Sequence, residues 1–224
     1  MLTPDDPAFP RDHDGLIPFG SFSEVLAPGA VVLRGFARPC ASAALQAIAA
    51  IAAVSPFRTM TTRGGYQMSV ALTSCGTLGW VTDASGYRYS TCDPLTGRPW
   101  PSMPAVLREL AVTAAAAAGY PTFDPDSCMV NRYEPGARLT LHQDRTERTH
   151  TAPVVSVSFG LPIRFQFGGA ERRDPVRSML LTHGDVAVWG GPARLAYHGV
   201  LPLKEGDHPM TGRCRLNITF RQAG

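Results

Sequence analysis

Residues 213–221 read RCRLNITFR, and their side chains alternate strictly between polar and apolar. The even positions hold Cys, Leu, Ile and Phe, whereas the odd positions hold Arg, Arg, Asn, Thr and Arg. This period of two predicts a β-strand with one apolar and one polar face. An edge strand with a solvated face gives the same pattern. However, Arg215 and Arg221, with Asn217 between them, match what a dicarboxylate requires, because guanidinium groups bind carboxylates bidentately and stay charged when buried.

Short runs of β-type residues lie on the N-terminal side of this strand and are separated by Gly, Pro and Asp. They cover 128–133, 138–143, 154–159, 163–167, 178–182, 185–189 and 195–199. Short strands at this spacing are typical of a sandwich or a barrel, and a jelly roll belongs to that set. The sequence therefore predicts a mainly β core over residues 127–224.

Two helices are predicted in the first half of the chain. Ala41 to Val54 is rich in alanine and ends at Ser55-Pro56, a helix stop signal. A second run, about Pro104 to Ala118, ends at Gly119, a usual C-terminal cap. We expect these helices to flank the β core, so that the fold class is α+β.

The rest of the first half carries weaker signals. Residues 31–33 are a short strand signal, and residues 58–100 show turn formers without a clear period, which predicts an irregular segment. We expect an N-terminal arm over 1–27 and a region over 28–126 that packs on the core within one compact domain.

The composition is ordinary for a globular protein, with 44% hydrophobic and 17% charged residues. The net charge of +3 permits a polyanionic partner without indicating one. Five cysteines, an odd number without a CxxC pair, predict reduced thiols in a reducing compartment. No basic segment followed by an apolar one opens the chain, and the longest apolar run, 41–54, is too short to span a bilayer. We expect a cytoplasmic monomer that does not associate with membranes.

Leu141-His142-Gln143-Asp144 contains a His-x-Asp motif in or at the end of a strand, so that its imidazole and carboxylate share a face. With a distant histidine, such a pair forms the facial triad of non-haem Fe(II) oxygenases, which leaves coordination positions open. An isolated His-x-Asp also occurs by chance on protein surfaces. His198 lies 54 residues after Asp144, far enough for several strands to return to the same end of a sandwich.

A second His-x-Asp motif, His183-Gly184-Asp185, is better explained by a tight turn between strands. Its glycine suits a turn, and only 13 residues separate Asp185 from His198. We therefore take His142, Asp144 and His198 as the metal ligands, and His183 as structural.

Further polar and aromatic residues have two interpretations each. Asn131 and Tyr133 share a strand face and could donate hydrogen bonds to a carboxylate, or could simply be buried and hydrogen-bonded. Trp80, Tyr87 and Tyr89 could form a stacking surface for a nucleobase, or could pack their segment against the core.

Beyond single motifs, the chain resembles the AlkB family of Fe(II)- and 2-oxoglutarate-dependent oxidative DNA/RNA dealkylases, and its bacterial members in particular. The resemblance runs from about residue 27 to the end. It rests on the stretches SPFRTM, GGYQMSVALTSCGTLGW, PWPSMPAVL, AAGYPTFDPDSCMVNRYEPGARLTLHQD, APVVSVSFGLP, FQFGGAERRDP, LTHGDVAVWGG, YHGVLPLK and CRLNITFRQAG.

The resemblance implies a double-stranded β-helix, a jelly-roll or cupin-like core, with an N-terminal nucleotide-recognition lid over its mouth. It gives His142, Asp144 and His198 the iron positions. The 2-oxoglutarate positions it implies are Arg215 for the distal carboxylate, helped by Asn131 and Tyr133, with Asn217 and Arg221 near the carboxylate that chelates iron. The substrate positions it implies are Trp80, Tyr87 and Tyr89 in the lid, Arg172, and position 146.

The implied reaction is oxidative N-demethylation of bases such as 1-methyladenine and 3-methylcytosine, with O2 and 2-oxoglutarate as cosubstrates. Succinate and CO2 form, and the hydroxylated methyl carbon leaves as formaldehyde. Single-stranded DNA should be favoured, because the base must leave the helical stack; double-stranded DNA and RNA stay open as substrates.

One position departs from the family pattern. Bacterial members carry an acidic residue after the HQD motif that faces the amino group of the base, whereas this chain has Thr146. Base preference is therefore open, and Glu147 could substitute if the loop slipped by one residue. Two other functions stay as alternatives: the same chemistry on RNA or free nucleotides, and a cupin-like metal-binding module without catalysis.

Overall fold

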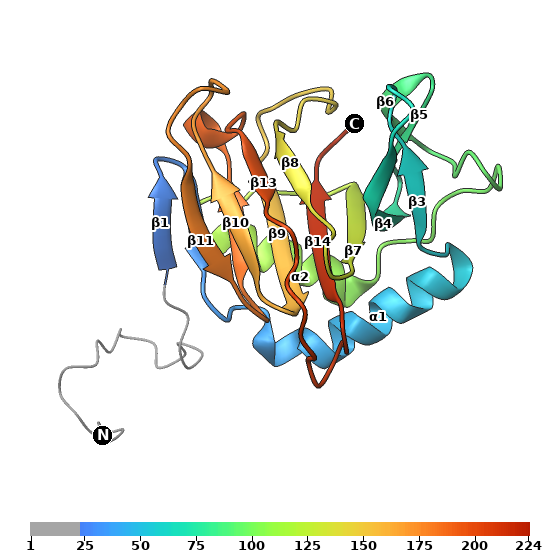
Figure 1. The fold of residues 1–224 in the computed structure, drawn as a ribbon, viewed down its shortest axis with the longest axis horizontal. Helices are drawn as coiled ribbons and strands as arrows, with labels where there is room; N and C mark the ends of the chain where they lie inside the picture. Colours follow the sequence, from blue (N-terminus) through green and yellow to red (C-terminus); the bar gives the residue numbers. More distant parts are fainter. Residues whose placement is uncertain (1–22) are drawn as a thin grey trace.

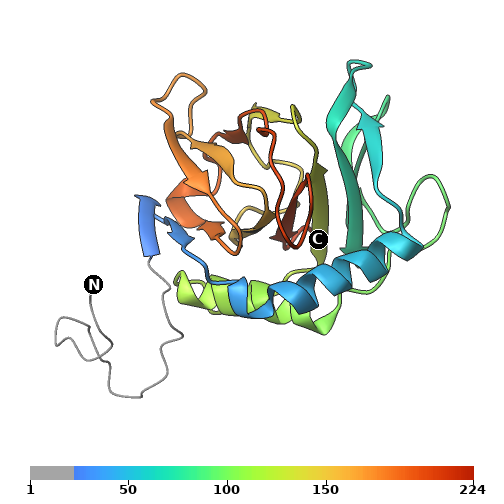
Figure 2. The same cartoon turned by 60° about the horizontal axis from the view of Figure 1, so that its bottom comes forward.

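The computed structural model describes residues 23–224 and folds the β-type runs into two main sheets that lie across from each other (Figures 1 and 2). The larger sheet has eight strands in the order β1 (Ser23–Ala27), β2 (Ala30–Leu33), β12 (Val186–Trp189), β9 (Val154–Gly160), β14 (Arg215–Arg221), β7 (Ser127–Tyr133), β4 (Gln67–Gly76) and β3 (Arg58–Thr61). The smaller sheet has the order β11 (Arg177–Leu181), β10 (Ile163–Phe167), β13 (His198–Val200) and β8 (Leu139–His142). Two sheets closed in this way form the predicted jelly-roll core.

The helices cover the outer face of the larger sheet. They are α1 (Ala41–Val54) and α2 (Ala105–Ala117), which run side by side beneath it in Figure 2. Both predictions are confirmed to within a residue, and Gly119 has the positive φ of +91° that a helix-terminating glycine adopts. Among residues 23–224, no helix is both long and apolar enough to cross a membrane.

Residues 58–100 were predicted as irregular, and this prediction is wrong. They contain β3, β4 and the hairpin of β5 (Gly79–Asp83) and β6 (Gly86–Ser90), which stands next to β3 and β4 at the upper right of Figure 1. Strand β4 alone runs for ten residues and pairs with β7. The middle and the end of this strand are buried. Its sequence, QMSVALTSCG, therefore lacks the regular alternation of polar and apolar residues that signals a half-exposed strand.

The expected boundaries also shift. Residues 1–22 lie outside the described part of the chain, but Ser23–Ala27, which we placed in the arm, form β1 and pair with β2. Four strands of the larger sheet come from the N-terminal side of residue 127, where we expected the core to begin. The β core is thus assembled from both halves of the chain.

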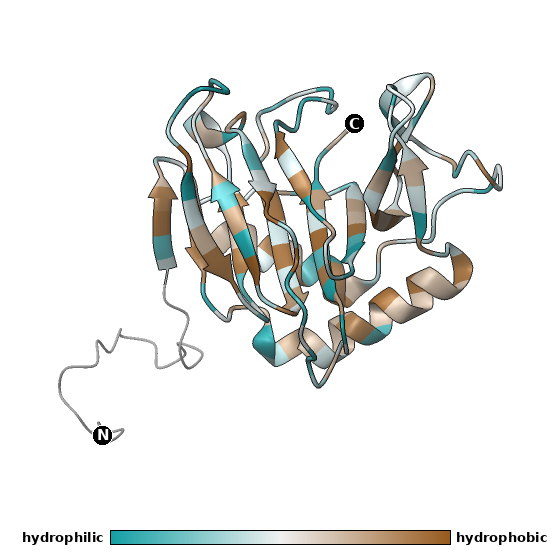
Figure 3. Ribbon diagram, in the orientation of Figure 1, coloured by the Kyte–Doolittle hydropathy of each residue, from teal (hydrophilic) through white to brown (hydrophobic). Residues whose placement is uncertain are grey.

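Strand β14 occupies the middle of the larger sheet, between β9 and β7. Its even positions Ile218 and Phe220 belong to the apolar cluster that includes Ile48 of α1 and Leu107 of α2. Its odd positions, Arg215 to Arg221, face the space between the sheets and are buried as well. The division into two faces is therefore confirmed, but the strand is central and neither face is solvated. Figure 3 shows brown bands interrupted by white and teal ones along several strands of the core.

Candidate metal centre and adjoining cavities

His142, Asp144 and His198 come together at one end of the core. One potential ligand atom from each lies within 4.8 Å of the others. His142 Nε2 is 4.0 Å from Asp144 Oδ1, and His198 Nε2 is 3.8 Å from Asp144 Oδ2. The predicted grouping is confirmed, and two imidazoles with one carboxylate are the donor set of a facial triad.

The smaller sheet brings the two histidines together. His142 ends β8 and is the register partner of His198, the first residue of β13. Each Nδ1 lies within hydrogen-bond distance of a backbone oxygen two residues earlier, at 2.8 Å from Thr140 and 3.0 Å from Ala196. These contacts fix Nδ1 as the donor and leave Nε2 free to coordinate a metal. Burial, together with the neighbouring His142, lowers the pKa of His198 to about 4, so its ring is neutral at pH 7.

Asp144 follows β8 and is held by the larger sheet. Arg221, at the end of β14, donates from Nε and Nη2 to Asp144 Oδ2, at 3.0 and 2.7 Å. Burial opposes the charge of this carboxylate, but Arg221 and the two histidines hold its pKa well below the usual value. A charged carboxylate is the form that binds a metal ion.

His183 lies outside this cluster. Its Nδ1 accepts a hydrogen bond from the Gly160 backbone, 3.1 Å away, and its ring stacks on His208. Gly184, with a φ of +86°, turns the chain between β11 and β12, and Asp185 pairs with Arg34. The second His-x-Asp motif therefore forms a tight strand connection, as its sequence suggested.

A small cavity of about 50 Å³ extends from the histidines into the core. Its lining includes Asn131, Tyr133, Arg215 and Asn217, the predicted cosubstrate residues. Arg215 is 2% exposed and donates from Nη2 to Ser158 Oγ, yet its Nε and Nη1 have no hydrogen-bond partner among the described residues. Burial lowers the pKa of this guanidinium, and no described carboxylate forms an ion pair with it. Two unsatisfied donors on a buried cation fit the carboxylate of a bound acid.

A larger cavity of about 420 Å³ opens on the other side of the triad, under the β5–β6 hairpin. Trp80 and Tyr87 line it as a stacked pair with ring centroids 5.7 Å apart, and Tyr89 and Thr146 line it too. His142 and Arg221 line both cavities, so the two spaces meet at the metal cluster. We use the term lid for the hairpin of residues 79–90.

Arg172, a predicted substrate residue, does not line either of these cavities. Its Nη1 donates to the Leu141 backbone oxygen at 3.0 Å, and its guanidinium lies over the Tyr197 ring. It is therefore placed one residue from His142, at the rim of the site.

Two charged residues lie close to the metal cluster in positions that the sequence did not predict: Arg194 was not considered, and Glu147 was considered for a different role. Arg194 is buried and donates to the Asp144 backbone oxygen at 3.0 Å. Glu147, considered only as a contact for the base, has a side chain that is 1% exposed and lies between Arg194 and Arg221. No local sequence pattern indicates a role for Arg194, which directly follows the short 3-10 turn Gly191–Ala193 between two strands.

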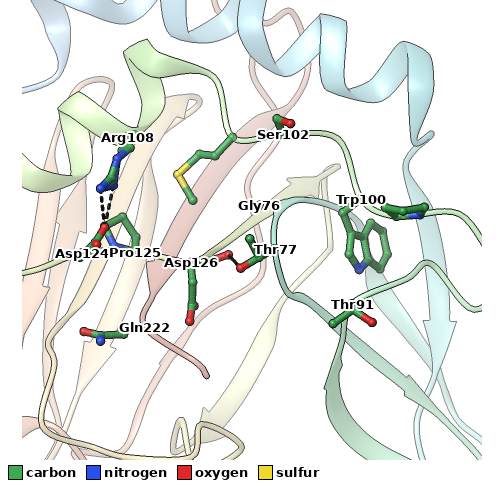
Figure 4. Close-up of a pocket in the computed structure, with 12 residues that line it drawn as sticks. Gly76, Thr77, Thr91, Trp100, Ser102, Arg108, Asp124, Pro125, Asp126 and Gln222 are labelled. Atoms are coloured by element: carbon green, nitrogen blue, oxygen red, sulfur yellow. Dashed lines mark hydrogen bonds and ion pairs between the residues drawn. The ribbon is translucent and has the colours of Figure 1, made fainter.

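A third cavity, of about 680 Å³, lies away from the metal cluster (Figure 4). It is lined by Trp100, Met103, Gln222 and the ion pair Arg108–Asp124. It contains none of the predicted site residues. Within residues 23–224, the only group of three potential metal ligands lies at the other two cavities, and we place the functional site there.

Comparisons with known proteins agree with this geometry. The family model of the 2OG-Fe(II) oxygenase superfamily matches residues 29–221. The alpha-ketoglutarate-dependent dioxygenase AlkB of Escherichia coli strain K12 is 58% identical over 203 residues, which cover 91% of this chain and 94% of that protein. The AlkB homolog of Caulobacter vibrioides is 46% identical, with 88% of each chain covered. The solved structure of OsALKBH1 superposes with a TM-score of 0.77 and 29% identity, over 89% of this chain and all of that one.

These matches span nearly the whole chain and include every residue of the metal cluster and of both adjoining cavities. The donor set, the unsatisfied Arg215 and the sheet topology fit the iron and 2-oxoglutarate that such enzymes use. The chain therefore belongs to the AlkB family of the 2OG-Fe(II) oxygenase superfamily, and is a dioxygenase that depends on Fe(II), 2-oxoglutarate and O2.

Proposed function

We propose that this dioxygenase repairs alkylated nucleic acid by oxidative N-demethylation of 1-methyladenine and 3-methylcytosine, with single-stranded DNA as the preferred substrate. The observation that carries the proposal is the junction of two cavities at His142, Asp144 and His198, one with an unsatisfied arginine and one with stacked aromatic rings. Such a junction brings a carboxylate cosubstrate and a planar base to the same metal cluster.

His142 Nε2, His198 Nε2 and the Asp144 carboxylate would hold Fe(II). When bound, the metal would activate O2 for its reaction with 2-oxoglutarate, which amino-acid side chains cannot do. The chain holds the three ligands in place through the backbone contacts of both imidazoles and through Arg221 on Asp144. Three ligands on one side leave room for the cosubstrate on the other.

Arg215 would bind the distal carboxylate of 2-oxoglutarate with its free Nε and Nη1. Tyr133, whose ring lies 5.0 Å from this guanidinium, and Asn131 would complete the pocket. Asn217 is tied to Ser156 and Asn131 by hydrogen bonds, which holds that wall of the cavity rigid beside Arg221.

Trp80 and Tyr87 would stack against the methylated base, which reaches the cavity only after it leaves its helical stack. Thr146 would face the base, and Arg172 at the rim would contact the neighbouring backbone. Single strands supply such a base without the energy of unpairing, which supports the preference for single-stranded substrates.

The chain would act as a cytoplasmic monomer. Its five cysteines are free, in agreement with a reducing compartment.

The proposal is tested by mass spectrometry of methylated oligonucleotides after incubation with enzyme, Fe(II) and 2-oxoglutarate. The panel contains the same lesions in single-stranded DNA, duplex DNA, RNA and free nucleotides. We expect loss of 14 mass units per lesion, a mass difference set by the removal of CH2, and the fastest loss in single-stranded DNA. Faster loss in RNA or in free nucleotides would reassign the substrate, and succinate formation without demethylation of any member would overturn the proposal.

A further inference from the structure

Glu147 is a buried carboxylate on the loop that follows β8, three residues after Asp144. Its side chain is 1% exposed, and its Oε2 lies 3.3 Å from Arg194 Nη2. Arg194 also donates to the backbone oxygens of Asp144 and Ala152, at 3.0 and 2.9 Å, and so ties both ends of this loop together. His150 Nε2 lies 3.9 Å from Glu147 Oε2, and this oxygen has no hydrogen-bond partner among the described residues. The charge of Arg194 offsets part of the cost of removing this carboxylate from water.

The other oxygen of Glu147 connects the lid with the larger sheet. Glu147 Oε1 accepts a hydrogen bond from the Tyr89 hydroxyl of β6, 2.9 Å away. The same oxygen lies 3.2 Å from Arg221 Nε, and Arg221 donates to Asp144 Oδ2. A continuous chain of polar contacts thus runs from Tyr89 in the lid through Glu147 and Arg221 to the carboxylate of the metal cluster.

We propose that Glu147 is a positioning residue that couples the lid to the metal carboxylate, an inference that rests on the proposed function. Arg221 is shared between two carboxylates, and its orientation depends on both. When Tyr89 is held against Glu147, Arg221 is fixed and Asp144 keeps one orientation. When Tyr89 moves away, Glu147 loses a donor and is held less firmly. Arg221 then loses a fixed contact on one side, and Asp144, which Arg221 holds, becomes less ordered.

This role removes Glu147 as a contact for the base. Its two oxygens already face Tyr89 and Arg221 on one side and Arg194 and His150 on the other, and the side chain has almost no exposed surface from which to reach a substrate. Thr146, which is exposed and lines the lid cavity, stays as the residue of this loop that can meet the base.

The coupling can be measured without metal or substrate. Amide hydrogen–deuterium exchange of the metal-free protein is compared for wild type, Glu147→Gln, Tyr89→Phe and the double variant. We expect each single variant to speed exchange in β6 and in residues 143–149 roughly tenfold, the factor of one charged hydrogen bond. The double variant should be no faster than either single one, because both changes break the same link. Glu205→Gln is the matched control, since Glu205 forms an ion pair with Arg213 in which both side chains are about 70% exposed.

A second measurement links the coupling to catalysis. The ratio of succinate formed to formaldehyde released from a methylated oligonucleotide should rise several-fold in Glu147→Gln and in Tyr89→Phe, and stay unchanged in Glu205→Gln. A wild-type protein that releases no formaldehyde would contradict the proposed function. The hydrogen–deuterium exchange rates would still test the coupling, because they are measured without substrate.

Three results would overturn the inference. Exchange that rises equally in α1 and α2 would show that Glu147 supports the whole fold and not the lid. Effects of the two variants that add would show that Tyr89 and Glu147 act independently. If Glu147→Gln does not fold, the exchange rates of Tyr89→Phe test the inference by themselves, because this variant removes a single hydroxyl. Unchanged exchange in residues 143–149 of Tyr89→Phe would then contradict the inference.

Discussion

At the scale of single residues, His142 and His183 offer a direct comparison, because each begins a His-x-Asp motif and only the first joins the metal cluster. We expect His142→Ala to lose Fe(II) and all turnover, since two ligands rarely hold this ion with one face open. His183→Ala should keep its iron and lose about 1 kcal/mol of stability, through the hydrogen bond from Gly160. Iron content after anaerobic gel filtration measures both. Iron lost from His183→Ala and kept by His142→Ala would contradict the ligand assignment.

Thr146 supports a second prediction. Methylation at N1 of adenine or N3 of cytosine leaves the base cationic near neutral pH, with an amino group that donates hydrogen bonds. The Thr146 hydroxyl can accept such a bond but carries no charge, so about 1–2 kcal/mol of discrimination is absent. Thr146→Asp should therefore raise kcat/KM for 1-methyladenine relative to the neutral lesion 1-methylguanine, roughly five- to thirtyfold, measured at one salt concentration. An unchanged ratio would show that position 146 does not face the base.

Residues of the site differ in how far the sequence could predict them. The metal cluster was predictable because His142 and Asp144 are close in sequence, and because His198 lies far enough away to return to the same end of the core. Arg194 was not, since its partners, the backbone of residues 144 and 152, come from a distant loop. Glu147 was considered only as a possible substitute for Thr146 beside the base, since its burial between two arginines depends on tertiary packing that the sequence does not show.

At the scale of elements, strand β14 turns its polar residues toward the small cavity and its apolar residues toward the helices. Arg215→Lys should raise the KM for 2-oxoglutarate about ten- to a hundredfold and leave the KM for DNA nearly unchanged, because lysine cannot form two parallel hydrogen bonds to a carboxylate. Cys214→Ala, next to the strand and outside the cavity, should change neither constant. Steady-state kinetics with both substrates measures the difference. Equal effects of the two substitutions would contradict the placement of Arg215 in the cosubstrate cavity.

The lid is the element that should recognise the base. Trp80→Ala and Tyr87→Ala should each lower kcat/KM for methylated DNA roughly five- to a hundredfold, since stacking contributes about 1–3 kcal/mol per base. The slow turnover of 2-oxoglutarate without DNA should be unaffected. Leu95→Ala, at an exposed position outside both cavities of the site, serves as the control. Loss of the DNA-independent turnover as well would mean that the aromatic pair holds the fold together.

The sequence predicted a helix or strand where turn-forming residues mark both of its ends, or where one face of a strand is exposed. The strands from β7 onward and both helices were located to within about three residues, because Gly, Pro and Asp punctuate that part of the sequence. Strand β4 was missed because burial on both sides removes the alternation of polar and apolar residues. Strand β14 shows the opposite problem: a polar face toward a ligand cavity has the same sequence pattern as a polar face toward water.

At the scale of the whole molecule, the position of β14 has a thermodynamic consequence. The strand contributes Arg215 to the cavity that we propose for the cosubstrate, and Ile218 and Phe220 to the cluster that joins the sheet to both helices. Unfolding that core therefore destroys the cosubstrate site. A ligand that binds only the folded chain raises the free energy of unfolding by an amount that grows with its concentration relative to Kd, about 2.7 kcal/mol at one hundred times Kd.

This linkage makes thermal denaturation a binding assay for the cosubstrate. With metal present and oxygen excluded, saturating 2-oxoglutarate should raise the Tm by roughly 5–10 °C for a chain of this size. Arg215→Lys should lose most of the shift at the same concentration, and Trp80→Ala should keep it. A full shift in Arg215→Lys would place the cosubstrate elsewhere. Because the strand joins binding to the stability of the entire core, the enzyme should be most resistant to heat and proteolysis in cells that are rich in 2-oxoglutarate.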